Sequence, residues 1–81
     1  MLETNKTIKI YPNPVSNELI IEAVGNSKKL YFEMLNSIGQ IVFKGTLFDK
    51  TIVQTTNFTP GVYLIKLENG HGFEFKNIVK R

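Results

Sequence analysis

The stretch VYLIKLENGHGFEFKNIVK, residues 62–80, decides the fold. Residues 62–68 alternate between two sets of side chains, as expected for a β-strand with one buried and one outer face. Asn69-Gly70 is the dipeptide most typical of a two-residue hairpin turn. Residues 72–80 then alternate again, so we expect them to return as the second strand of a β-hairpin.

The same two-residue period continues toward the N-terminus, and no stretch keeps a helical period. The strands expected there are residues 8–11, 18–24, 29–36, 40–46 and 51–55. Turn residues separate them, among them Gly25-Asn26-Ser27 and Ser37-Ile38-Gly39, where we expect Gly39 at positive φ. About seven short strands with such turns predict an all-β chain folded as an immunoglobulin-like β-sandwich of antiparallel strands, with a compact barrel as the alternative. The order of the strands stays open.

The alternation also predicts which side chains share a face. Ile41 and Phe43 are expected to be buried, and Phe58 to close the edge of the core. Tyr63 is expected in the core, with its hydroxyl bonded to a loop carbonyl. In the last strand, one face is expected to hold Phe73, Phe75 and Val79, and the other Glu74, Lys76 and Lys80. From the alternation alone, the two lysines are expected to face solvent.

Length and composition exclude several classes of protein. A chain of 81 residues has room for one domain, and without cysteine it has neither disulfides nor thiolate metal sites. The net charge of +3 is spread too thinly to predict nucleic-acid binding. No apolar run approaches the roughly 20 residues that span a bilayer, so we expect no membrane insertion.

Catalytic and cofactor chemistry also lacks candidates. The one imidazole, His71, stands at a predicted hairpin tip, where it is expected to be a solvated turn residue. The seven acidic residues are scattered singly, which argues against a metal site or a carboxylate pair. We therefore expect no enzyme, no cofactor and no metal.

Five segments in a fixed order carry a family resemblance. They are Tyr11-Pro12-Asn13-Pro14, residues 18–22, residues 36–42, residues 58–67 and residues 75–81. Together they resemble the C-terminal sorting domain, type A, of cargo proteins exported by the type IX secretion system of Bacteroidetes. The chain departs from that pattern at Asn36, where the family often has Asp, and at Gln40, where it often has Arg or Lys.

The resemblance implies one sorting domain over residues 8–81, preceded by residues 1–7 as a linker or a remnant of cloning. Such a domain is a transport signal. The type IX translocon at the outer membrane would recognise it after its passage through the periplasm, and a surface sortase would then remove it. An upstream cargo in the same chain would thereby reach the cell surface or the medium.

The residues that the resemblance singles out for recognition are Tyr11, Pro12, Asn13, Pro14, Gly39, Gly61, Tyr63, Lys76, Val79 and Lys80. Each also has a purely structural interpretation: Pro12 and Pro14 can blunt a sheet edge, and Gly39 and Gly61 can serve the backbone. The last strand is expected near a sheet edge, which would also allow a weak homodimer.

Two other functions compete with sorting. A carbohydrate-binding module would need a planar set of exposed aromatic rings, but tryptophan is absent and most phenylalanines fall on predicted core faces. An adhesive or inert immunoglobulin-like spacer gives no reason for the five segments to run to residue 81.

Overall fold

The computed structural model of the chain describes residues 7–24, 28–68 and 72–81. The predicted turns at Gly25-Asn26-Ser27 and Asn69-Gly70 lie outside the described residues, as do His71 and residues 1–6 of the expected linker. The strands on either side of Asn69-Gly70 are described, and they pair antiparallel, which confirms the predicted hairpin of residues 62–68 and 72–80.

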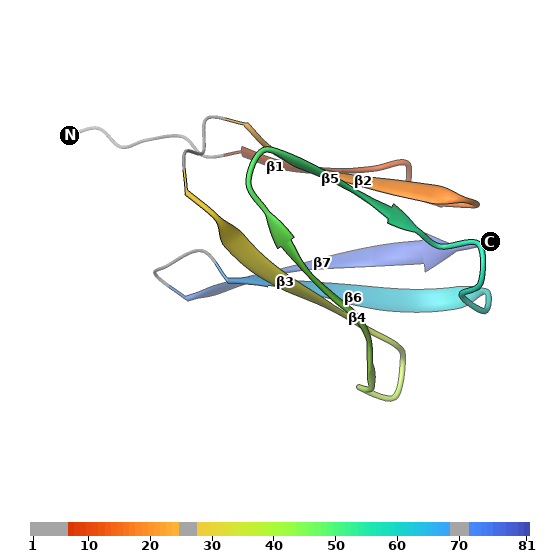
Figure 1. Cartoon of the computed structure of the whole chain (residues 1–81). Helices are drawn as coiled ribbons and strands as arrows, with labels where there is room; N and C mark the ends of the chain where they lie inside the picture. Colours follow the sequence, from red (N-terminus) through yellow and green to blue (C-terminus); the bar gives the residue numbers. More distant parts are fainter. Residues whose placement is uncertain (1–6, 25–27, 69–71) are drawn as a thin grey trace.

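Within these ranges the chain forms seven β-strands in two sheets that face each other (Figure 1). The strands are β1 (Thr7–Tyr11), β2 (Glu18–Val24), β3 (Leu30–Leu35), β4 (Ile41–Leu47), β5 (Lys50–Gln54), β6 (Gly61–Glu68) and β7 (Phe73–Lys80). One sheet has the order β1-β2-β5 and the other β4-β3-β6-β7, with every neighbouring pair antiparallel. The predicted all-β sandwich is confirmed, and two separate sheets replace the alternative of a barrel.

The apolar core lies between the two sheets, as expected when each strand turns every second side chain inward. Its buried members are Val15, Leu19, Ile21, Ala23, Leu30, Phe32, Met34, Leu47, Val53, Tyr63, Ile65, Leu67 and Ile78. Phe43 and Phe58 are partly buried against this cluster, which confirms that Phe58 closes its edge. No helix in the described ranges is long and apolar enough to cross a membrane.

The expected burial is wrong at two places. Phe73, Phe75 and Val79 share one face of β7 as predicted, but it is the outer face: they are 53%, 56% and 41% exposed, while Ile78 faces inward. Ile41 is 49% exposed. A β-bulge between Met34 and Leu35 shifts the β3–β4 register there, and such a shift changes the face that a side chain takes.

Tyr63 closes the corner between β5 and β6. It is 5% exposed, and its hydroxyl donates a hydrogen bond of 2.6 Å to the carbonyl of Thr59. The ring packs against Phe58 with a centroid distance of 5.5 Å. This confirms the predicted core tyrosine bonded to a loop carbonyl. A tyrosine that bonds back to the chain just upstream is a hallmark of immunoglobulin-like sandwiches.

We predict that Tyr63→Phe lowers the free energy of unfolding by about 1 kcal/mol, because the Thr59 carbonyl loses its donor while the packing of the ring is kept. Urea denaturation measures the change. Tyr31→Phe is the matched control: Tyr31 is 55% exposed on the outer face, so the loss there should stay within about 0.5 kcal/mol. Equal losses in the two variants would contradict a structural role for the Tyr63 hydroxyl.

Candidate recognition site

Residues 12–15, here called the crossing segment, leave β1 in one sheet and run beside β7 of the other. Asn13 makes two contacts there: its Oδ1 accepts a hydrogen bond from the Val79 N–H at 2.9 Å, and its Nδ2 donates one to the Asn77 carbonyl at 3.1 Å. The partners are 64 and 66 residues away in the sequence. The structure thereby joins two segments that the sequence shows only as separate landmarks.

Val15 continues this contact with its own main chain. Its N–H donates to the Val79 carbonyl at 2.8 Å, and its carbonyl accepts from the Arg81 N–H at 2.9 Å. The two bonds form a short parallel bridge between Val15 and Lys80. The Val15 side chain is 1% exposed and belongs to the core. Val15 and Asn77 are functional candidates that the sequence did not reveal, because Val15 looks like any apolar residue after a turn.

The residue types of the crossing segment explain why it takes this path. Pro12 and Pro14 have no N–H to donate, so they cannot extend the β1–β2 ladder beyond Tyr11. The peptide bonds before both prolines are cis. The amide of Asn13 offers one acceptor and a pair of donor hydrogens, which match the N–H and C=O of a strand edge. Asn13 thus takes the place of a neighbouring strand.

Tyr11, the last residue of β1, is bonded through its side chain to the neighbouring strand β2. The hydroxyl donates a hydrogen bond of 3.0 Å to the Glu22 carboxylate. This bond raises the pKa of Tyr11 above its ordinary value of 10.0, with smaller contributions from desolvation and from the charge of Glu22.

The three predicted residues of β7 have different environments. Lys76 is exposed, and Val79 is 41% exposed on the outer face. Lys80 is 8% exposed, so the expectation that it faces solvent is wrong. It lies on the same face of β7 as the core residue Ile78, and its Nζ donates to the Arg81 carbonyl at 2.9 Å. The stem is buried while the ammonium group reaches a polar atom, as is common for lysine.

Gly39 and Gly61 take backbone conformations that favour glycine, in agreement with their structural interpretation. Their φ angles are 86° and 152°, in the region that side chains rarely adopt. Asn36 organises the turn that contains Gly39, since its Oδ1 accepts from the N–H groups of Ile38 and Gln40. Its Nδ2 donates to the Gln40 Oε1 at 2.9 Å. The two positions that depart from the family pattern therefore contact each other.

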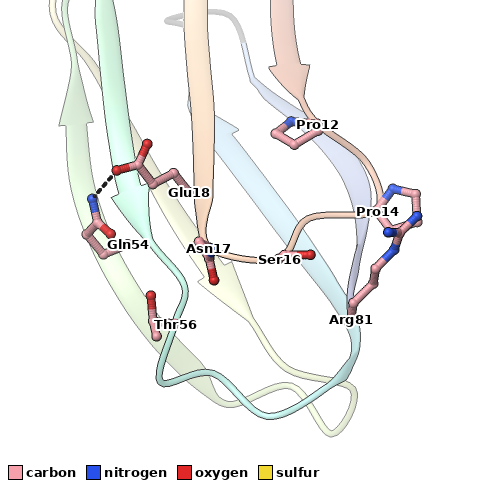
Figure 2. Close-up of a pocket in the computed structure, with 8 residues that line it drawn as sticks. All are labelled: Pro12, Pro14, Ser16, Asn17, Glu18, Gln54, Thr56 and Arg81. Carbon is pink, nitrogen blue, oxygen red and sulfur yellow. Dashed lines mark hydrogen bonds between the residues drawn. The ribbon is translucent and has the colours of Figure 1, made fainter.

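Two hollows adjoin these residues. The first has a volume of about 860 Å³ and lies beside the crossing segment (Figure 2). Its lining consists of Pro12, Pro14, Ser16, Asn17, Glu18, Gln54, Thr56 and Arg81. The second, of about 370 Å³, is lined in part by Gly39, Tyr63 and Asn77. The structure thus brings Asn13 to Val79 through a hydrogen bond, Pro12 and Pro14 to Arg81 in the first hollow, and Gly39 to Tyr63 in the second. Lys76 is absent from both linings.

Three aromatic side chains lie on the outer face of the four-stranded sheet, although most phenylalanines were expected on core faces. Tyr31, Phe73 and Phe75 are each more than half exposed, so fewer phenylalanines are buried than predicted. The rings of Phe73 and Phe75 are 6.5 Å apart and inclined by 42°, and the Lys66 Nζ lies 4.3 Å from the Phe73 centroid. These two rings are not coplanar. Among the described residues there is no group of three or more side chains suited to a metal ion.

Comparison with known proteins gives one finding. The family model of the secretion system C-terminal sorting domain matches residues 9–81. A search of curated proteins gave no match. The matched range begins in β1 and includes the crossing segment and the whole of β7.

We predict that Asn13→Ala lowers the free energy of unfolding by about 1–2 kcal/mol, because the Val79 N–H and the Asn77 carbonyl both lose a partner. Hydrogen exchange of the Val79 amide should also become faster. Asn57→Ala is the control, since Asn57 is exposed and its side chain has no hydrogen bond within residues 7–24, 28–68 and 72–81. Unchanged exchange at Val79 in the Asn13 variant would contradict the contact.

We predict that Tyr11 titrates above pH 10.0 in the folded chain. The folded state favours the protonated hydroxyl, so this stabilisation is present at lower pH and is lost as the pH rises through the folded pKa. Comparison of the ultraviolet phenolate titration with that of Tyr11→Phe isolates this group. Glu22→Ala should return the pKa toward its ordinary value, and an unchanged pKa would contradict the assigned cause.

Proposed function

Because the chain belongs to the family of type IX secretion C-terminal sorting domains, which act as export signals, we propose that the outer-membrane translocon binds its folded form. A surface sortase then removes the domain from an upstream cargo. The cargo passes through the periplasm and ends at the cell surface or in the medium. The domain itself performs no catalysis.

The contact between the crossing segment and β7 supports this proposal best. It places Pro12, Pro14 and Arg81 on the same hollow (Figure 2). Val79 is joined to this segment by the hydrogen bond from its N–H to Asn13. We call these four residues the terminal surface: Pro12, Pro14, Val79 and Arg81. Segments from both ends of the matched range thus form one surface that a receptor can read.

Their contacts divide the predicted recognition residues into two groups. Those whose exposed side chains a translocon can contact directly are Pro12, Pro14, Lys76 and Val79. The others hold the shape of the domain through hydrogen bonds, backbone angles or, for Tyr63 and Lys80 alone, burial: Tyr11, Asn13, Gly39, Gly61, Tyr63 and Lys80. Lys80 in particular contributes through its buried stem rather than as a surface charge.

A carbohydrate-binding or adhesive module is the second candidate, and the exposed rings of Tyr31, Phe73 and Phe75 favour it. Sugar rings stack on flat aromatic surfaces, however, whereas Phe73 and Phe75 are inclined by 42°. The cation of Lys66 already lies over the Phe73 ring. The geometry therefore supports sorting better than glycan binding.

An export assay tests the proposal. We would fuse residues 1–81 to the C-terminus of a fluorescent protein that carries a signal peptide, in a host with type IX secretion. The reporter should reach the surface or the medium, and deletion of the translocon should stop it. Val79→Lys should reduce export at least severalfold, because it adds a charge to the terminal surface without removing a buried side chain.

Val42→Lys is the matched control, since Val42 is 38% exposed and lies on β4, at the other edge of the same sheet. It should be exported like the parent chain. Deletion of residues 78–81 should also abolish export, but it removes Ile78, which is 2% exposed, and so tests folding as well. A folded reporter retained in the periplasm would refute the sorting function, and glycan screens would follow.

A further inference from the structure

The outer edge of β7 consists of two unlike halves. Among the described strands, β7 is the last of its sheet and has β6 as its one neighbouring strand. Its odd-numbered residues turn their N–H and C=O groups away from β6, as the bonds of Val79 to Asn13 and Val15 show. From Asn77 to Arg81 the crossing segment covers this edge. From Phe73 to Asn77 no other strand lies beside it in the described part of the chain.

This open half, residues 73–77, has the properties of a pairing site. An uncovered edge strand offers unpaired main-chain groups to another strand. Phe73 and Phe75 are 53% and 56% exposed on its outer face, so a partner strand would also cover apolar surface. Among the described residues, Phe48 is the one other phenylalanine whose side chain is exposed to a similar extent.

We propose that the open half of β7 pairs antiparallel with the open half of β7 in a second copy of this chain. In a two-fold pairing centred on Phe75, residue 75 faces its own copy and residue 73 faces residue 77. Residues 73–77 are thus used from end to end. Asn77 is shared with the covered half, because its carbonyl already accepts from the Asn13 Nδ2, but a carbonyl oxygen can accept a second hydrogen bond. The two four-stranded sheets become one continuous sheet.

The charges of β7 select this register. With Phe75 at the centre, Glu74 stands opposite the second copy's Lys76, and Lys76 opposite its Glu74. A centre at residue 74 would place the two Glu74 side chains opposite each other, and a centre at residue 76 the two Lys76 side chains. Opposite charges in directly facing positions stabilise an antiparallel pair, and like charges destabilise it. The sequence of β7 is therefore complementary to itself in one register.

The phenylalanine side chains on the outer face of β7 favour the same register. The two Phe75 rings would lie beside each other across the two-fold axis, at a Cβ separation of about 4.5–5.5 Å. Part of the apolar area that each ring now exposes would be covered. Because only five residues of each copy pair, the buried area is small and the dimer is weak and dependent on concentration.

Sedimentation of the 81-residue chain over a wide range of concentrations tests the proposal. Glu74→Lys and Lys76→Glu each place like charges in both facing positions, so each alone should weaken self-association about tenfold. An equimolar mixture of the two variants again places opposite charges in both positions. The mixture should therefore associate as the parent chain does, with one copy of each variant in the dimer.

Lys44→Glu is the matched control, because it makes the same change of charge on β4, at the far edge of the sheet. It should leave association unchanged. Faster hydrogen exchange of the Phe75 amide on dilution provides an independent readout of the pairing. A chain that stays monomeric up to its solubility limit, or variants that do not recover association when mixed, would overturn the proposal.

Discussion

The rest of the structure depends on the hydrogen bonds between the crossing segment and β7. In the described part of the chain the two sheets share no strand, and the sequence contains no cysteine that could join them by a disulfide. Asn13 and Val15 supply a main-chain-like partner to the edge of β7, while the Val15 side chain enters the core. A small domain with a thin core needs such ties between its layers.

The same segment divides β7 into parts with different exposure. Where it covers the edge, the main-chain groups of Val79 are satisfied and only side chains remain for a receptor. Where it is absent, main-chain groups, the rings of Phe73 and Phe75, and the charges of residues 74 and 76 lie at the edge. The terminal surface and the pairing edge can therefore share one strand while using different residues of it.

The sequence predicts the local features of this fold and misses those set by distant contacts. Alternation locates the strands, and the positive φ of Gly39 and the role of Tyr63 follow from turn and corner chemistry. Both faces of β7 carry apolar residues, however, so alternation cannot decide which face is inner. The pairing of Ile78 with Tyr63 decides it, and it buries Lys80 and exposes Phe73 and Phe75. A β-bulge exposes Ile41 in the same unpredictable way.

The candidate recognition site shows the same contrast between local features, which the sequence predicts, and distant contacts, which it does not. The sequence identified the Tyr-Pro-Asn-Pro turn and the last strand, but the bonds that join them connect residues 64 and 66 positions apart. No local pattern shows such a contact, and Val15 gave no signal. The consequence for sorting is physical: the terminal surface exists only after both ends of the matched range have come together. A translocon that binds it would therefore select folded domains, because an unfolded chain presents the same residues without their arrangement.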